Sequence, residues 1–204
     1  GVLHSTAADQ TRPDSERLFH LEQVANKAGD RIGLLRAFSR SEAQAATDPL
    51  TGLRNRRSLE ERVQEITRGG GDFAVAFGDL DHFKQLNDLH GHETGDRALR
   101  LFARVLRDTV RPTDVVARWG GEEFVIILPS TTVSDAARIL ERIREGLALA
   151  LASATVPPFT VSFGVCASDD GDDLEAVIAV ADTALLSAKR TGRNRTVIAC
   201  QEPD

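Results

Sequence analysis

The sequence predicts an α+β fold: a mainly antiparallel sheet flanked by helices and preceded by an N-terminal coiled-coil helix. Three observations predict it. Strand-like and helix-like segments alternate along most of the chain, two consecutive strand-like runs meet at a Gly-Gly pair, and the stretch from Asp14 to Ala46 contains no proline and carries apolar residues at steps of three and four. Such an order brings strand ends and the hairpin turn to one edge of a sheet.

The composition indicates one globular domain with an appendage. The chain has 204 residues, of which 41% are hydrophobic and 27% charged, and its net charge of -6 argues against nonspecific nucleic-acid binding. We find neither an apolar run of the ~18 residues that a membrane helix needs nor a signal-peptide pattern. Cys166 and Cys200 lie far apart without a C-x-x-C motif, which favours reduced thiols and a cytoplasmic location.

The N-terminal part reads as a linker followed by a stalk. Residues 1–13 are polar and are predicted to be a linker or disordered, and residues 14–46 are predicted to form a dimerising stalk helix; an amphipathic helix packed on its own domain is the alternative. A first residue of glycine and the absence of methionine suggest a fragment that lacks an upstream sensory or receiver domain. The predicted seam consists of Leu18, Leu21, Ala25, Ala28, Ile32 and Leu35.

The globular domain is predicted to span residues 47–204, beginning at the turn-rich junction 48–52. Its strands are recognised by β-type runs such as Phe73–Phe77 and Thr160–Cys166, and the order of elements resembles a ferredoxin-like palm. In chain order we expect helix 56–68, strand 72–79, helices 82–90 and 95–110, hairpin 114–129, helix 133–152, strand 159–167, helix 172–190 and strand 195–199.

The Gly-Gly pair lies between the two strands of the hairpin. We predict that Gly120 and Gly121 form a two-residue turn with positive φ at both positions. Glu122 and Glu123 follow directly, and in an ideal strand they would point to opposite faces, so a shared site requires a distorted backbone. A solvated hairpin tip is the alternative.

A second acidic cluster lies where the strand at 72–79 ends. Asp79 is predicted to end this strand and Asp81 to cap the next helix, whose first amides form an anion site. Two carboxylate clusters on strand ends, each beside glycine, indicate a site for a divalent cation that binds substrate phosphates. Mg²⁺ prefers a few carboxylates plus substrate oxygens as ligands.

Polar residues further along suit a purine ligand. Asn87 offers an amide donor and acceptor, and the Asp96 carboxylate accepts two N–H bonds, a pairing suited to a guanine edge. At the C-terminal end of the helix at 172–190, Lys189 and Arg193 could neutralise a triphosphate if that helix end faces the carboxylates. The alternatives are ordinary turn residues and a solvated helix end; zinc at His90 and His92 is disfavoured.

Taken together, these segments resemble the GGDEF family of diguanylate cyclases, with the GGEEF variant of its signature, over residues 47–199. An aromatic residue is more usual in the family at Leu186, a departure that concerns packing. The matching segments are DPLTGLRNRR at 48–57, DLDHFKQLND at 79–88, GHETGD at 91–96, RWGGEEF at 118–124, TVSFGV at 160–165, and ADTALLSAK at 181–189 with GRNR at 192–195.

The resemblance implies a homodimer in which two GTP molecules, one per subunit, condense into cyclic di-GMP and two pyrophosphates. Mg²⁺ or Mn²⁺ would be bound by Asp79, the Leu80 carbonyl, Glu122 and Glu123. Glu122 would also be the base, although a metal-bound carboxylate is a poor one. The guanine and ribose of GTP would be held by Phe83, Asn87, His92 and Asp96. The phosphates would be bound by Lys84, Lys189 and Arg193, and Lys84 would also have a catalytic role.

The resemblance also implies feedback by the product. Arg111 and Asp114 form an R-x-x-D motif at the family's spacing before Gly120, where cyclic di-GMP would bind and inhibit, with Arg138 and Arg142 as second-subunit contacts. Two other interpretations remain open: a catalytically silent receptor for GTP or cyclic di-GMP, and another palm-type nucleotidyl transferase or cyclase. The intact acidic residues disfavour the first, and Asn87 with Asp96 disfavours the second.

Overall fold

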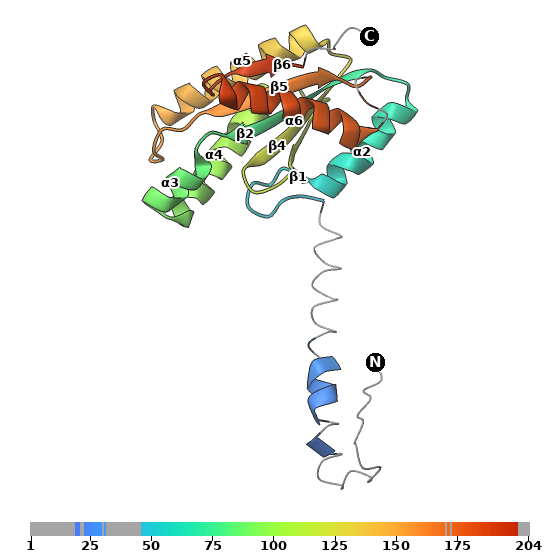
Figure 1. Ribbon diagram of the computed structural model, residues 1–204, viewed down its shortest axis with the longest axis vertical. Helices are drawn as coiled ribbons and strands as arrows, with labels where there is room; N and C mark the ends of the chain where they lie inside the picture. The colour runs from blue at the N-terminus through green and yellow to red at the C-terminus, as the bar shows by residue number, and fades with distance from the viewer. Residues whose placement is uncertain are drawn as a thin grey trace. The chain divides into compact units, whose positions relative to one another are not determined.

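The computed structural model describes residues 19–20, 23–29, 31, 46–169, 171 and 173–199, in two units, 1–45 and 46–204 (Figure 1). In the first unit, residues 19–20, 23–29 and 31 are helical, as expected for part of the predicted stalk. The linker 1–13 and four of the seam residues lie outside the described residues, so the coiled coil stays a prediction. Within the described ranges, no helix combines the length and the apolar character needed to cross a bilayer.

The second unit contains a six-stranded mixed sheet. The central pairs β3–β4, β4–β2 and β2–β5 are antiparallel and the two outer pairs are parallel, which confirms the mainly antiparallel palm. The two-residue β1 is too short to leave a periodic pattern and was not predicted. In sheet order the strands are β1 (Arg54–Asn55), β3 (Val115–Arg118), β4 (Glu123–Pro129), β2 (Phe73–Leu80), β5 (Val161–Ala167) and β6 (Thr196–Ile198).

The helices begin and end close to the predicted positions. Asn55, Thr132 and Asp173 each cap a helix by accepting a backbone N–H with the side chain. The prediction that Asp81 caps the next helix is wrong, because the cap residue is His82, at φ 58° and without a side-chain bond. The helices are α2 (Arg56–Arg68), α3 (Phe83–His90), α4 (His92–Thr109), α5 (Val133–Leu151) and α6 (Leu174–Arg190).

The sheet is buried on both faces. Every residue of β2 is buried, and successive side chains enter opposite cores because strand side chains alternate. Ala74 and Ala76 belong to the core that contains residues of α4 and α5, whereas Val75 and Phe77 belong to the core that contains residues of α2 and α6. Figure 1 shows α6 running across the sheet. Cys166 is fully buried, as predicted, and its thiol donates to the Val177 carbonyl.

The strand register brings the acidic segments to one edge. Asp79 of β2 is paired with Glu123 of β4, and the Leu80 amide donates to the Glu122 carbonyl at 3.3 Å. On the other side of β2, Leu80 is paired with Val161, the first residue of β5. The C-terminal end of β2 therefore meets the hairpin loop at one edge of the sheet, as the order of elements predicts.

Candidate active site

The centre of the site is an ion pair between β2 and α6. The Lys189 ammonium lies 2.9 Å from the Asp79 carboxylate, whose side chain is 11% exposed. Lys189 stands in the last turn of α6, where a cation also interacts favourably with the helix dipole. The end of α6 therefore faces the carboxylates, which was the condition set for Lys189 in the sequence analysis.

The hairpin loop differs from the predicted two-residue turn. Four residues, 119–122, separate β3 from β4, and neither Gly120 nor Gly121 has a positive φ. Gly120 provides space instead: a Cβ there would lie 2.4 Å from Oε2 of Glu123, so any other residue would displace this carboxylate. The missing side chain lets the Glu123 carboxylate fold back over the loop, while Glu122 stands in the loop outside the strand.

These carboxylates share one electrostatic environment. Burial raises the pKa of Asp79, and the Lys189 charge opposes this effect. Burial also raises the pKa of Glu122 and of Glu123, and in both cases the Asp79 charge is the next contribution. The three raised pKa values thus come first from burial and then from repulsion between neighbouring carboxylates, and a bound cation would favour the charged form of each group.

The residues fit a divalent cation completed by a ligand. In the described part of the chain, no three His, Cys, Asp or Glu side chains are grouped closely enough to hold a metal by themselves. Mg²⁺ commonly takes one or two carboxylates and draws its other ligands from water and substrate phosphates. Asp79, Glu122 and Glu123 supply carboxylates of this kind at one edge, beside the Leu80 backbone.

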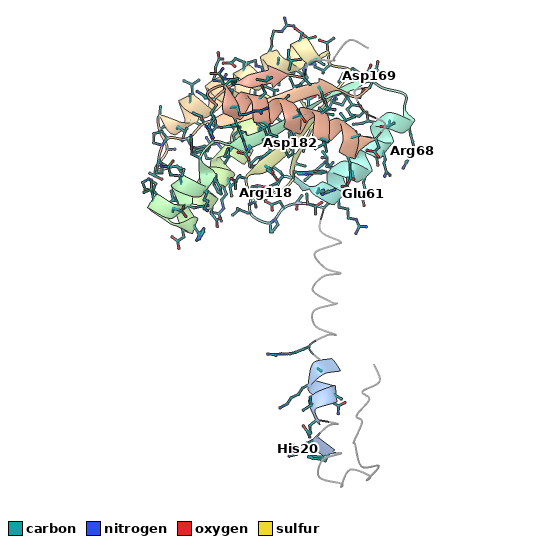
Figure 2. The ribbon with its side chains drawn as sticks, viewed as in Figure 1. His20, Glu61, Arg68, Arg118, Asp169 and Asp182 are labelled. Carbon is teal, nitrogen blue, oxygen red and sulfur yellow. The ribbon has the colours of Figure 1, made fainter. Side chains whose placement is uncertain are left out.

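Asp182 is a member of the cluster that the sequence analysis missed. Its charge raises the pKa of both Asp79 and Glu123. Figure 2 shows Asp182 on α6, where it precedes Lys189 by two helical turns and so lies on the same face. That spacing of seven residues was the signal in the sequence that could have identified it.

Two of the predicted base-binding residues, Phe83 and Asn87 of α3, lie against Gly95 of α4. Oδ1 of Asn87 is buried and has no hydrogen-bond partner among the described residues. A Cβ at Gly95 would lie 1.9 Å from this oxygen and 3.1 Å from the Phe83 ring, so glycine makes room for the amide. An unsatisfied buried acceptor is costly unless a ligand supplies a donor. Asp96 follows Gly95 and is half-buried.

In the described part of the chain, no side-chain hydrogen bond or ion pair joins three other predicted ligands to the acidic cluster. His92 is exposed at the start of α4, and Lys84 is exposed in the first turn of α3. Arg193 lies in the loop after α6, with a left-handed backbone at φ 58°. None of these three side chains forms an ion pair with another described residue, so their cationic or polar groups are open to a ligand.

The hairpin loop is also tied to the start of the domain. The Arg118 guanidinium donates to the Gly121 carbonyl at 2.7 Å and to the Asp48 carboxylate at 3.1 Å, and both charged side chains are 17% exposed. Asp48 in turn accepts the backbone N–H of Thr51 at 2.8 Å. Arg56 of α2 lies over the Trp119 ring, 4.2 Å from its centroid. Figure 2 labels Arg118 at the end of β3.

The R-x-x-D motif forms a turn between α4 and β3. The Arg111 amide donates to the Asp114 carboxylate at 2.8 Å, and the Asp114 amide donates to the Arg111 carbonyl. Arg138 pairs with Asp135, whose pKa is lowered by the Thr132 hydrogen bond, by Arg138 and also by Arg111. Asp135 is thus paired with Arg138 and feels the Arg111 charge, while the Arg142 side chain donates to the Thr109 carbonyl at 3.4 Å.

Comparison with known proteins places the chain among cyclases. Residues 45–195 match the family model described as "Diguanylate cyclase, GGDEF domain". The chain is 44% identical to diguanylate cyclase DgcP of Pseudomonas aeruginosa over 185 residues, which is 88% of this chain and 28% of that protein. It is 43% identical to response regulator PleD of Caulobacter vibrioides over 162 residues, 75% of this chain and 36% of that protein. The chain thus spans about a third of these relatives' lengths.

A solved structure agrees with the fold. The crystal structure of the coiled coil and GGDEF domain of DgcB from Caulobacter crescentus in complex with c-di-GMP has 32% sequence identity and a TM-score of 0.68. The match covers 87% of this chain and 98% of that chain.

Proposed function

The chain belongs to the GGDEF family of diguanylate cyclases, and we propose that it joins two GTP molecules, one held by each subunit of a homodimer, into cyclic di-GMP with release of two pyrophosphates. The observation that carries this proposal is the edge where Asp79, Glu122 and Glu123 meet Lys189. It combines carboxylates for a divalent cation with an ammonium for phosphate oxygens.

In this proposal the chain orients GTP from both ends. Asn87 takes a guanine donor with its unsatisfied Oδ1, and Asp96 accepts further N–H groups of the base. Phe83 and His92 would lie beside the guanine and ribose. Lys84, Lys189 and Arg193 hold the triphosphate and stabilise the negative charge that develops on the departing pyrophosphate.

The bond changes are those of a nucleotidyl transfer. The 3′-oxygen of one GTP attacks the α-phosphorus of the other, the bond to the bridging oxygen of the β-phosphate breaks, and pyrophosphate leaves; the second transfer closes the ring. In this proposal Glu122 receives the 3′-hydroxyl proton, the role that the family resemblance implies for it. Mg²⁺ or Mn²⁺, when bound at Asp79, the Leu80 carbonyl, Glu122 and Glu123, would supply Lewis-acid stabilisation of the phosphates.

Product feedback is part of the proposal. Arg111 and Asp114 would bind cyclic di-GMP, and Arg138 and Arg142 would contact product held by the second subunit. Two observations support this site: Arg138 pairs with Asp135, and the Arg111 charge contributes to the lowered pKa of Asp135. An upstream sensory or receiver domain would set how often two catalytic domains face each other.

The test is cyclic di-GMP formation from GTP and Mg²⁺ at high protein concentration, followed by chromatography. We expect product from the wild type, a loss of at least about 100-fold in Glu122→Gln, and wild-type rates in Glu61→Gln, a matched change at an exposed ion pair of α2. Tight cyclic di-GMP binding without any product formation would instead identify the chain as a receptor.

A further inference from the structure

We infer that Asp81, Asn194 and Arg144 form a positioning network that fixes the loop carrying Arg193 and thereby sets the affinity for the triphosphate. This inference rests on the proposed function, because it assumes that Arg193 binds phosphate. None of the three residues needs to touch the nucleotide, so each is a positioning residue rather than a catalytic one.

Asp81 is the buried end of the network. It follows β2 and is 4% exposed. Its carboxylate accepts the Thr160 hydroxyl at 2.6 Å, the Ser162 hydroxyl at 2.8 Å and the Asn194 backbone N–H at 3.0 Å. A buried carboxylate requires donors of this kind, and here one of them comes from the loop after α6. The carboxylate therefore connects the end of β2 to that loop.

The loop backbone is in an unfavourable conformation. Arg193 has φ 58° and Asn194 has φ 48°, both in the left-handed region that most non-glycine residues avoid. Such a conformation persists when surrounding contacts determine it. On one side the Arg193 amide donates to the Ala188 carbonyl at 2.9 Å, and on the other the Asn194 amide is held by Asp81.

Arg144 of α5 holds the same loop from outside. Its side chain is 16% exposed, and its Nε and Nη2 donate to Oδ1 of Asn194 at 3.2 and 2.9 Å. Glu141, one turn earlier on α5, pairs with the same guanidinium. Asn194 is thus bound through its backbone by Asp81 and through its side chain by Arg144.

The backbone of Arg193 is fixed while its guanidinium is available. Among the described residues, no hydrogen bond or ion pair engages that guanidinium, although Lys189 one turn earlier is paired with Asp79. A cation on a restrained backbone binds an anion with little loss of conformational freedom. The network therefore supports a ligand contact in addition to the stability of the loop.

The experiment measures binding of 3′-deoxy-GTP with Mg²⁺ by calorimetry, because this nucleotide lacks the attacking hydroxyl and cannot be cyclised. We expect Arg144→Gln and Asn194→Gly each to weaken its binding about tenfold, the scale of one charge-assisted hydrogen bond, and to leave guanosine binding unchanged. Neither variant should cause a further loss in an Arg193→Ala background, because the network acts through Arg193.

Several outcomes would overturn the inference: additive losses with Arg193→Ala, equal losses for guanosine, or unchanged binding in both variants. Arg104→Ala, at an exposed ion pair of α4, is the matched control and should bind normally. If Arg144→Gln fails to fold, the binding measured with Asn194→Gly tests the inference by itself. Glycine accepts φ 48° at this position and keeps the backbone N–H that donates to Asp81. A wild type that binds no 3′-deoxy-GTP would contradict the proposed function itself.

Discussion

The Asp48 carboxylate and the Arg118 guanidinium form an ion pair at 3.1 Å across 70 residues of sequence. Asp48 lies near the start of the second unit, and Arg118 also donates to the Gly121 carbonyl of the hairpin loop. One guanidinium therefore joins the start of the domain to the loop that carries the acidic cluster.

The first prediction concerns this pair. Burial by itself raises the pKa of Asp48, but hydrogen bonds from Thr51 and the Arg118 charge outweigh it and lower the net pKa. A lowered folded-state pKa contributes stability above the unfolded value of 3.8, and this stability is lost as pH falls through the folded pKa. We expect Asp48→Asn to lower the free energy of unfolding by about 1–2 kcal/mol at pH 7, and by much less near pH 3.

Urea unfolding at the two pH values checks this prediction. Asp108→Asn, which removes a 3.7 Å pair on the surface of α4, is the control and should cost little at either pH. A loss of equal size at both pH values would show that the Asp48 charge is not the cause. If the ion pair also holds the hairpin loop, Asp48→Asn should reduce cyclic di-GMP formation from GTP.

The sequence was sufficient for the fold but not for the internal contacts of the site. Within the described ranges, the spacing of apolar residues predicted the helices and all strands except the two-residue β1, because buried faces leave a period in the sequence. The Gly-Gly pair was assigned the wrong role, since a glycine kept for space and one kept for positive φ look identical. Asp81 was taken for a helix cap because its partners, Thr160, Ser162 and Asn194, are distant in sequence.

The second prediction concerns repulsion in the acidic cluster. The folded-state pKa of Glu122 is raised above its ordinary 4.5 by burial and by the Asp79 charge. The folded state then binds a proton more tightly than the unfolded state, so stability falls as pH rises from 4.5 through the raised value. We expect Glu122→Gln to stabilise the protein by ~0.5 kcal/mol at pH 7 in EDTA, with no gain at pH 4. Urea unfolding at pH 7 and at pH 4 would measure the two free energies of unfolding. A Glu122→Gln variant that is less stable than the wild type at pH 7 would show that ionised Glu122 does not destabilise the folded state.

The third prediction is that Lys189 competes with a metal ion when no nucleotide is bound. Its ammonium already neutralises Asp79 at 2.9 Å, so Lys189→Met should tighten Mn²⁺ binding about fivefold, which corresponds to ~1 kcal/mol. Electron paramagnetic resonance of free Mn²⁺ measures this without turnover. Lys84→Met, at an exposed lysine of α3, is the matched control. Unchanged Mn²⁺ affinity in Lys189→Met would show that the ion pair does not oppose the metal.

The fourth prediction concerns feedback by the product. Asp135 carries a negative charge beside Arg138 and within the field of Arg111, and it would therefore oppose an anionic ligand held by these arginines. Whether the product is bound at Arg111 or contacted by Arg138 from the second subunit, we expect Asp135→Asn to bind cyclic di-GMP severalfold more tightly and to be inhibited at lower product concentration. Arg111→Ala should show the reverse, with synthesis sustained for longer and weaker binding.

Calorimetry with cyclic di-GMP measures product binding in these variants, and progress curves of cyclic di-GMP synthesis measure product inhibition. Asp108→Asn removes a comparable surface charge from α4 and should change neither binding nor inhibition, which separates a local effect of Asp135 from the change in net charge. Asp135→Asn keeps a side-chain oxygen that can accept the Thr132 hydroxyl, and it keeps the backbone N–H that donates to Thr132. The N-terminal cap of α5 should therefore be preserved. Weaker product binding in Asp135→Asn would mean that Asp135 holds the arginines in place instead of competing with the ligand.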